Sequence, residues 1–423
     1  MRFTKTTLQN GVRVITVPMK GNPTVTVLVN IATGAYYETP EQSGISHFLE
    51  HMCFKGTSKR PSSRDITIEL DSIGAAYNAF TTNEVTGFYA KADVKHFEDI
   101  GDIVADIYIN STFPEAEIAK EKGVVLGEID MYRDDPQERV HDALREHMYG
   151  GEPAGRDILG TKETVRAITR GDLIAYHNLH YTPRNTIVTI AGGIDEALML
   201  EWAKNTFGAA YGGEAGKEFL TKDREQAAPE TVLLEKDTDQ SHIVLAWRTF
   251  DRRHPDRFVA HLIKNVLRGG MSSRLFAKLR DEMGAGYYIG ASGSSYNSFG
   301  NFSIYTGTTA ERVPEIIGAT LGEVARLKSE PVSDAELHKV REFIKAHTIM
   351  SLETSDSMAE FFADQEILSD KMRTPEEFEG IFSIITAEDI MRVAGLMFDN
   401  RKLTVAAIGK GLNKEAIEKV LSF

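Results

Sequence analysis

The sequence predicts an α+β fold made of two homologous domains, each a mainly antiparallel sheet packed with helices. Strand patterns occur in both halves of the 423-residue chain, and one helix–strand–helix unit is repeated without a gap. Helices fall between the strands in no strict β-α alternation. We therefore expect antiparallel sheets with helices on one face rather than a parallel α/β sheet.

The repeated unit begins in both halves with an Ile-Thr pair ahead of a helical pattern. Thr169 and Thr386 are the expected N-caps, and each precedes an acidic residue by three positions, as in a capping box. A strand pattern follows at 186–190 and again at 403–407, so the two copies align at a constant offset of 217 residues. A repeat of this length indicates a duplicated domain.

The other strand patterns and the junction set the expected domain limits. Strands are expected at 12–15, 24–29 and 88–90 in the first half, and at 231–234, 242–246 and 302–305 in the second. A polar, glycine-containing stretch at 212–229 has no clear periodicity and is the expected linker. It separates an N-terminal domain, 1–211, from a C-terminal domain, 230–423.

Composition narrows the class of protein. The net charge of −14 is spread along the chain, so a nucleic-acid-binding role is not expected without a basic patch. Cys53 is the single cysteine, which rules out an internal disulfide and is typical of a reducing compartment. No apolar signal-peptide core and no membrane-spanning apolar run is apparent. The expectation is a cytoplasmic protein with no nucleic-acid or membrane partner.

The segment His47-Phe48-Leu49-Glu50-His51 carries the clearest chemical signal. Histidines four residues apart lie one turn apart on one helix face, where two imidazoles can hold one metal ion. The order His-x-x-Glu-His is the inverse of the commoner zinc-peptidase motif. The repeat places Lys264, Leu267 and Arg268 at the equivalent positions, so only the first half is expected to bind the metal.

Two histidines leave a zinc site incomplete, because a catalytic site usually takes three protein ligands and a water. The helical pattern after Pro114 contains Glu121 and Glu128, which are seven residues apart and share one stripe. Val124 and Val125 predict that this stripe faces inward, where a carboxylate needs a partner such as a metal. A solvated acidic helix fits the same spacing, so the residues alone leave both interpretations open.

Several stretches of the chain resemble the pitrilysin or insulinase family, the M16 metallopeptidases, and above all its short bacterial members and the mitochondrial processing peptidase subunits. They read GISHFLEHMCFKGT (44–57), NAFT (78–81), EKGVVLGE (121–128), YTPRN (181–185) and SSRLF (272–276). The resemblance covers essentially the whole chain, including the duplication.

The resemblance implies a complete zinc site. The third ligand of the family is a glutamate 77 residues after the second histidine, which is Glu128. His47, His51 and Glu128 would then hold one zinc ion per chain, and two histidines with one carboxylate suit zinc. Glu50 would be the catalytic base that takes a proton from the zinc-activated water. Glu121 would belong to the catalytic set as a support for the site.

The resemblance also implies substrate-binding residues. Asn78, Ala79 and Phe80 would lie on a sheet edge to which an extended peptide adds as another strand. Arg280 and Tyr287 match the spacing of the family's substrate-binding pair and can donate hydrogen bonds to a substrate carbonyl. From the residues alone, an ordinary strand, a surface arginine and a packed tyrosine are equally good interpretations.

Family enzymes enclose a chamber built from four homologous domains, and this chain supplies two. A homodimer whose active site is completed by the partner chain is therefore expected. The expected function is a zinc-dependent endopeptidase or oligopeptidase that hydrolyses extended, unfolded peptides. The alternatives are a non-catalytic subunit, although such relatives typically lose the metal ligands, and a processing peptidase that works only with a different subunit.

Overall fold

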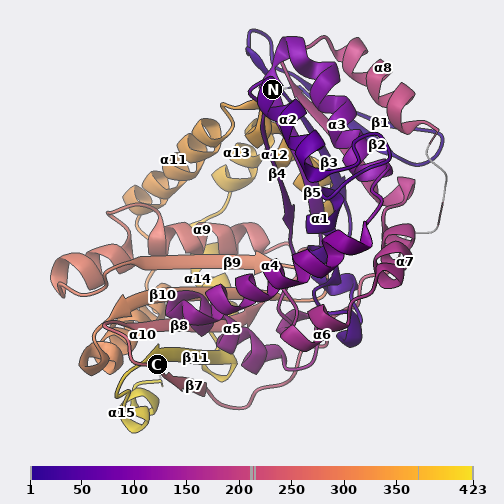
Figure 1. Cartoon of the computed structure of the whole chain (residues 1–423). Helices are drawn as coiled ribbons and strands as arrows, with labels where there is room; N and C mark the ends of the chain where they lie inside the picture. The colour runs from indigo at the N-terminus through magenta and orange to yellow at the C-terminus, as the bar shows by residue number, and fades with distance from the viewer. Residues whose placement is uncertain (1, 210–212, 214–215, 370, 422–423) are drawn as a thin grey trace. The chain divides into compact units, whose positions relative to one another are not determined.

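The computed structural model describes residues 2–209, 213, 216–369 and 371–421 (Figure 1). The chain forms two compact units. The first unit consists of Met1–Asp130, Arg156–Phe219 and Met350–Met372, and the second of Met131–Gly155, Leu220–Ile349 and Arg373–Phe423. Each half of the chain therefore contributes one segment to the unit that is built mainly from the other half.

The predicted domain limits at 211 and 230 describe homologous halves of the sequence, and they stay a prediction. Residues 212, 214 and 215 of the predicted linker lie outside the described residues.

The first unit contains a sheet in the order β1-β2-β6-β3-β5-β4. Its strands are β1 (Thr4–Thr7), β2 (Arg13–Pro18), β3 (Thr24–Ile31), β4 (Ala76–Thr81), β5 (Thr86–Asp93) and β6 (Thr186–Gly192). β2 and β6 run parallel, whereas the other neighbouring strands are antiparallel. The sheet is thus mainly antiparallel, as the sequence predicts.

The second unit contains a sheet in the order β7-β11-β8-β10-β9. Its strands are β7 (Glu230–Glu235), β8 (Ser241–Thr249), β9 (Ile289–Ser295), β10 (Gly300–Thr308) and β11 (Leu403–Gly409). Again one pair, β7 with β11, is parallel and the other neighbours are antiparallel.

The duplication predicted from the sequence is confirmed by the bounds and the register of these strands. β2 and β7, and likewise β6 and β11, have bounds that differ by the same 217 residues. The parallel pairs also share their register, since Arg13 faces Ile187 in the first sheet and Glu230 faces Thr404 in the second. Capping boxes begin the helices after Thr169 and Thr386, as expected.

Helices surround both sheets. The first unit contains α1 (Ile45–Cys53), α2 (Ser63–Ser72), α3 (Phe97–Ile109), α6 (Lys162–Ala167), α7 (Arg170–His180), α8 (Glu196–Phe207), α12 (Ser355–Leu368) and α4 (Glu115–Asp134) up to Asp130. The second unit contains α5 (Pro136–Tyr149), α9 (Arg257–Arg268), α10 (Val313–Ser329), α13 (Pro375–Ser383), α14 (Ala387–Met397), α15 (Lys414–Lys419), a π-helix (Phe276–Glu282) and α11 (Asp334–Ser351) up to Ile349.

The prediction that helices cover one face of each sheet is wrong. In the first unit, alternate residues of β3 face opposite cores: Val27 belongs to the core shared with α1 and α3, and Leu28 to the core shared with α12. α12, drawn in orange, packs on β3 and β6 (Figure 1). In the second unit, α5 packs on β8 and β11, while α14 packs on the other core face. Both covering helices, α5 and α12, come from the half of the sequence that forms most of the other unit.

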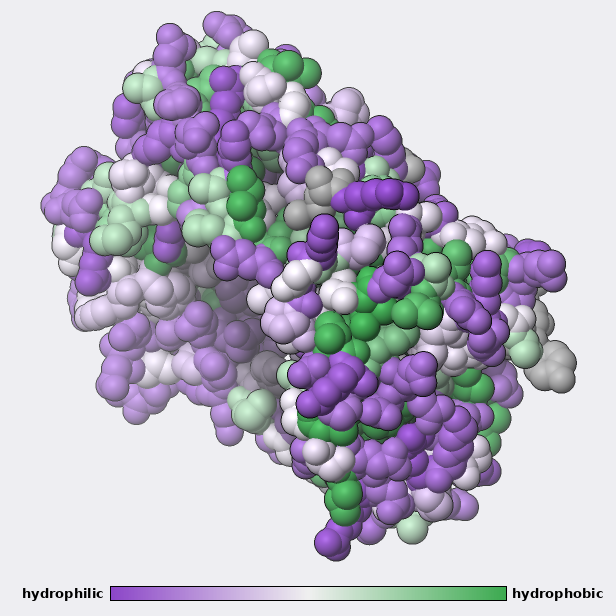
Figure 2. Space-filling model, turned by 90° about the horizontal axis from the view of Figure 1, so that it is seen from above, coloured by the Kyte–Doolittle hydropathy of each residue, from purple (hydrophilic) through white to green (hydrophobic). Residues whose placement is uncertain are grey.

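The surface drawn in Figure 2 is largely hydrophilic, with hydrophobic residues exposed in limited patches. None of the helices within the described ranges combines the length and the apolar character needed to cross a membrane.

Candidate metal centre

Helix α1 presents both histidines of the motif from one face. The Nε2 atoms of His47 and His51 lie 3.2 Å apart, and His47 is buried. The opposite side of the helix, with Phe48, Leu49 and Met52, is fully buried in the core. The apolar residues therefore fix the rotation of the helix, and this rotation turns the histidines to the same side.

A buried carboxylate fixes the start of α1. Glu38 accepts hydrogen bonds from the backbone N–H groups of Gly44 and Ser46, both at 2.8 Å. Gly44 has φ 93°, in the left-handed region that favours glycine, and a Cβ there would meet the backbone of Leu159. Glu38 satisfies amide groups that a helix start leaves without an intrahelical partner. Its position makes it a structural support for the motif helix.

Helix α4 supplies the two glutamates that the spacing indicated. Glu121 is buried at 4% exposure and Glu128 is half-buried, so the stripe that they share faces the motif helix. Val125 is fully buried, in agreement with the sequence. The expectation is wrong for Val124, whose side chain is 54% exposed. Val124 lies three positions from Glu121, and this step of about 300° turns its side chain away from the buried edge of the stripe.

His47, His51 and Glu128 converge on one point. The Oε2 atom of Glu128 lies 3.7 Å from Nε2 of His47 and 3.8 Å from Nε2 of His51. In the described part of the chain, no other group of histidine, cysteine and acidic side chains converges in this way. The convergence brings together the three residues expected to act as ligands.

The donor atoms fit a zinc ion. Bonds of about 2.0–2.1 Å in a tetrahedron place ligand atoms roughly 3.3–3.4 Å apart, close to the spacing of these three atoms. His51 donates from Nδ1 to Oε1 of Glu121 at 2.8 Å, because a carboxylate only accepts. In the neutral ring this leaves the Nε2 lone pair of His51 free on the side of His47 and Glu128. Imidazole nitrogens and a carboxylate are ligands that zinc prefers.

Glu50 lies beside this group and is held by strand β4. Thr81, the last residue of β4, donates its hydroxyl to Oε2 of Glu50 at 2.6 Å. Burial raises the pKa of Glu50 above its ordinary value, while the Thr81 hydrogen bond and the nearby His51 offset part of that rise. The contact occupies one carboxylate oxygen and leaves the other available to a water.

The two histidines have different protonation. Burial lowers the pKa of His47 to about 3, with His51 adding to the effect, so His47 is neutral at physiological pH. Burial would also lower the pKa of His51, but Glu121, Glu50 and Glu128 outweigh it and raise that pKa above its ordinary value. Competition between a proton and a metal is therefore expected at His51.

We expect zinc affinity to fall with falling pH because of His51. Below the pKa of His51 each bound zinc displaces one proton, so the dissociation constant rises about tenfold per pH unit. In Glu121→Gln the carboxylate that contributes most to the raised pKa is lost, and the onset of this dependence moves to lower pH. Competition with a fluorescent zinc chelator between about pH 5 and pH 8 measures both effects. A constant affinity over this range would contradict the assignment.

The expected substrate strand is a sheet edge. β4 ends the strand order of the first sheet and pairs with β5 on one side. Asn78 is exposed, whereas Ala79 and Phe80 are half-buried. The Ala79 N–H donates to Oδ1 of Asn78 at 2.9 Å. An amide that bonds to its neighbour's side chain can exchange this bond for one to an added strand.

Arg280 and Tyr287 belong to the second unit. Tyr287 is 61% exposed, and the Nη1 atom of Arg280 donates to the carbonyl of Gly286 at 3.2 Å. Gly284 and Gly286 have φ values of 59° and 79°, so the chain between the pair turns through left-handed conformations that favour glycine. The expected tight turn is confirmed, and it holds the two side chains on one short segment.

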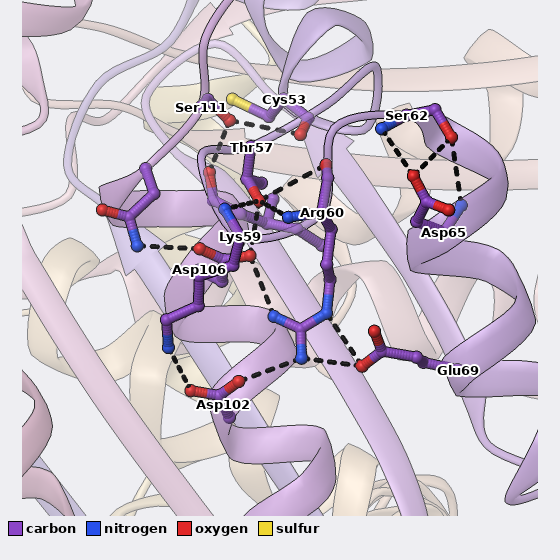
Figure 3. A network of polar contacts seen from close by, with 12 residues as sticks. Cys53, Thr57, Lys59, Arg60, Ser62, Asp65, Glu69, Asp102, Asp106 and Ser111 are labelled. Carbon is purple, nitrogen blue, oxygen red and sulfur yellow. Dashed lines mark hydrogen bonds and ion pairs between the residues drawn. The ribbon is translucent and has the colours of Figure 1, made fainter.

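A buried network of polar contacts fixes the loop after α1 (Figure 3). Arg60 donates to Glu69 on α2 and to Asp102 and Asp106 on α3, at distances of 2.7 to 2.9 Å. The Asp106 side chain is fully buried and also accepts from Thr57 at 2.5 Å. Two helices and the exit of the motif helix are thereby joined through one guanidinium.

Replacing Arg60 with methionine is expected to lower the free energy of unfolding by about 3 kcal/mol, because it leaves the Asp106 carboxylate buried without its cation. Urea denaturation followed by circular dichroism measures this change. Arg64→Met removes an exposed arginine of α2 and serves as the matched control, with an expected effect within about 0.5 kcal/mol. Equal stability of the two variants would show that the network contributes little.

Two family models match consecutive parts of the chain. The model described as insulinase (peptidase family M16) matches residues 13–162, and the one described as the peptidase M16 inactive domain matches residues 167–343. The "Uncharacterized zinc protease YmxG" of Bacillus subtilis (strain 168) is 37% identical over 393 residues, which cover 92% of this chain and 93% of that protein. The chain belongs to peptidase family M16.

Further relatives agree with this membership. An "Uncharacterized zinc protease" of Rickettsia bellii is 31% identical, over 96% of this chain and 97% of its own. A solved protease from Helicobacter pylori superposes with a TM-score of 0.90 at 23% identity, covering 96% of this chain and 99% of that one. A Pseudomonas fluorescens structure described as a peptidase M16 inactive domain gives 0.89 at 18%, with 97% and 99% covered. At these identities the two structures show a shared fold.

The two M16 models divide the candidate residues. The first spans all three converging residues and Glu50, and the second spans Arg280 and Tyr287. The description "inactive" agrees with the replacement of the motif by Lys264, Leu267 and Arg268 in the second half.

Sequence reasoning missed three residues that act on the M16 centre. Glu38 starts the motif helix, Thr81 holds Glu50, and Lys55 contacts Glu121 at 2.8 Å. Lys55 and Thr81 lie in stretches that carried the family resemblance, but nothing in their spacing indicated their partners. Each contact joins residues far enough apart in the sequence that only the fold brings them together.

Proposed function

We propose that this chain is a zinc-dependent endopeptidase or oligopeptidase that hydrolyses extended, unfolded peptides. The observation that carries the proposal is the convergence of His47, His51 and Glu128 beside the carboxylate of Glu50. Relatives named as zinc proteases support the metal and the type of reaction. A non-catalytic subunit would have no need for this complete set of groups.

The chain's own residues supply the metal site. His47 and His51 would hold the ion through Nε2, and Glu128 through a carboxylate oxygen. Zinc bound there would lower the pKa of a water ligand and polarise the scissile carbonyl. Glu121 would keep the Nδ1 proton on His51, so that its other nitrogen stays free to bind.

Glu50 is the proposed general base. Its buried carboxylate has a raised pKa, which brings it nearer to that of a group able to accept and return a proton at neutral pH. It would take a proton from the attacking water and deliver it to the leaving amine. The Thr81 hydroxyl fixes one oxygen of Glu50 and so limits the rotation of the other.

The substrate would add to the outer edge of β4. Main-chain hydrogen bonds from residues 78–80 would hold an extended peptide, which favours unfolded substrates and loose sequence selectivity. Because Thr81 ends the same strand and contacts Glu50, the peptide and the base would be held by one short segment.

Purification of the chain alone and cleavage of a quenched-fluorescence peptide test the proposed function. We expect hydrolysis that a chelator abolishes and that one equivalent of zinc restores. Inactivity of the zinc-loaded chain, with activity only after another subunit is added, would favour the heteromeric processing peptidase. Inactivity under both conditions would overturn the proposal.

We propose in addition that two copies form the working enzyme, with Arg280 and Tyr287 of one chain contacting the peptide at the partner's zinc site. The exposure of Tyr287 on a glycine-rich turn supports this role. Mixing Glu50→Gln chains with Arg280→Ala chains is expected to restore activity, since a mixed dimer then has one site with both groups intact. Lack of recovery after verified subunit exchange would contradict the shared site.

A further inference from the structure

Lys55 makes a contact with the metal centre that the proposed chemistry does not use. It lies two residues beyond the end of α1, and its Nζ donates to Oε2 of Glu121 at 2.8 Å. The other oxygen of Glu121 accepts from Nδ1 of His51, also at 2.8 Å. Lys55, Glu121 and His51 thus form a continuous chain of charge-assisted contacts that ends at the proposed metal position.

Glu121 needs both partners because of its burial. Its side chain is 6% exposed, and a carboxylate in such a place must be paired through each oxygen to offset its lost hydration. With Lys55 bound to Oε2, the plane of the carboxylate is fixed and Oε1 stays directed at His51. Without Lys55, the carboxylate has one partner and can turn about its last torsion.

The contact also joins the two helices that carry the proposed ligands. His51 belongs to α1, and Glu121 belongs to α4, two turns before Glu128. The pair Lys55–Glu121 therefore spans the gap between the histidines and the third ligand. It acts on the spacing of the ligands as well as on the orientation of one imidazole.

The backbone that carries Lys55 is held in place. The N–H of Lys55 donates to the carbonyl of Met52, and the carbonyl of Gly56 accepts from Thr112 at 3.1 Å. Gly56 has φ 143°, and a Cβ there would lie 2.5 Å from the carbonyl oxygen of Pro61. The Arg60 network of Figure 3 fixes the next residues. Lys55 is thus a side chain on a rigid support.

We propose that Lys55 is a positioning residue of the metal centre, which fixes Glu121 so that His51 presents Nε2 to the ion in the correct orientation. This inference rests on the zinc site proposed above. It predicts an effect on metal binding whose sign differs from that of simple charge. Removing a cation near the site would by Coulomb's law strengthen the binding of Zn²⁺, whereas loss of positioning weakens it.

The test measures zinc affinity by chelator competition at one pH near 7.5 for the full-length chain and three variants. Loss of an outer-sphere partner typically weakens metal binding about 10- to 100-fold, so we expect at least a tenfold loss for Lys55→Met. Lys55→Arg, which keeps a donor, should recover most of the affinity. Lys59→Met is the matched control, because Lys59 pairs with Asp102 in the same loop and its side chain is 54% exposed.

The outcomes separate this inference from the zinc site itself. Failure of the unaltered chain to bind zinc would overturn the proposed function. Zinc binding by the unaltered chain together with equal or tighter binding by Lys55→Met would overturn only the role of Lys55. An equal loss in Lys55→Met and Lys59→Met would assign the effect to the loop and would likewise contradict positioning by Lys55. Circular dichroism spectra confirm that each variant is folded.

Discussion

Replacing Glu50 with glutamine is expected to lower the turnover of peptides about 100- to 10,000-fold while zinc stays bound, because general acid–base catalysis contributes a factor of this size. Glutamine has the same shape and can still accept the Thr81 hydroxyl through its amide oxygen. It cannot take a proton from water at neutral pH. The substitution therefore removes the base and preserves the packing around it.

Steady-state cleavage of a quenched peptide and zinc content by atomic absorption measure the two parts of this prediction. Glu115→Gln makes the same chemical change at an exposed position at the start of α4 and should leave both values unchanged. Near-normal turnover by zinc-loaded Glu50→Gln would exclude Glu50 as the base. Loss of zinc together with activity would instead show that Glu50 helps to hold the ion.

Replacing Glu128 with alanine is expected to abolish stable zinc binding, with the dissociation constant raised at least about 100-fold, since even outer-sphere changes cost 10- to 100-fold. The variant keeps both histidines but loses the only ligand expected from α4. Glu128 is half-buried near the two Nε2 atoms, so a water that replaces its carboxylate supplies no charge. Hydrolysis should fall with the zinc content.

Chelator competition with the purified variant measures this loss. Glu117→Ala, on the same helix, removes a glutamate whose only printed partner is the surface residue Lys120, and it should bind zinc normally. Retention of one tightly bound zinc by Glu128→Ala would mean that another residue completes the site. Recovery of binding in Glu128→Asp would support a ligand role for the carboxylate.

Much of the fold could be predicted because the sequence contains its own comparison. The constant offset between the two halves indicated the duplication, and the strands and capped helices follow it. The helical spacing of His47 and His51 likewise predicted that they share a face, and they do. These are local patterns, which depend on the periodicity of one element.

Contacts between distant segments could not be predicted in this way. The spacing of Glu121 and Glu128 fitted a solvated helix as well as a site, and Val124 was wrongly expected to be buried. No pattern indicated that α5 and α12 would cover the sheet formed mainly by the other half. The contacts of Thr81 and Lys55 depend on the fold in the same way, since their partners lie 31 residues or more away in the sequence.

Anomalous diffraction at the zinc absorption edge, from crystals of the chain loaded with one equivalent of zinc, tests the central assignment most directly. We predict one strong peak per chain at about 2.0–2.2 Å from Nε2 of His47, Nε2 of His51 and a carboxylate oxygen of Glu128, with Glu50 outside bonding distance. A peak elsewhere in the chain, or one that lacks any of these three ligands, would contradict the account.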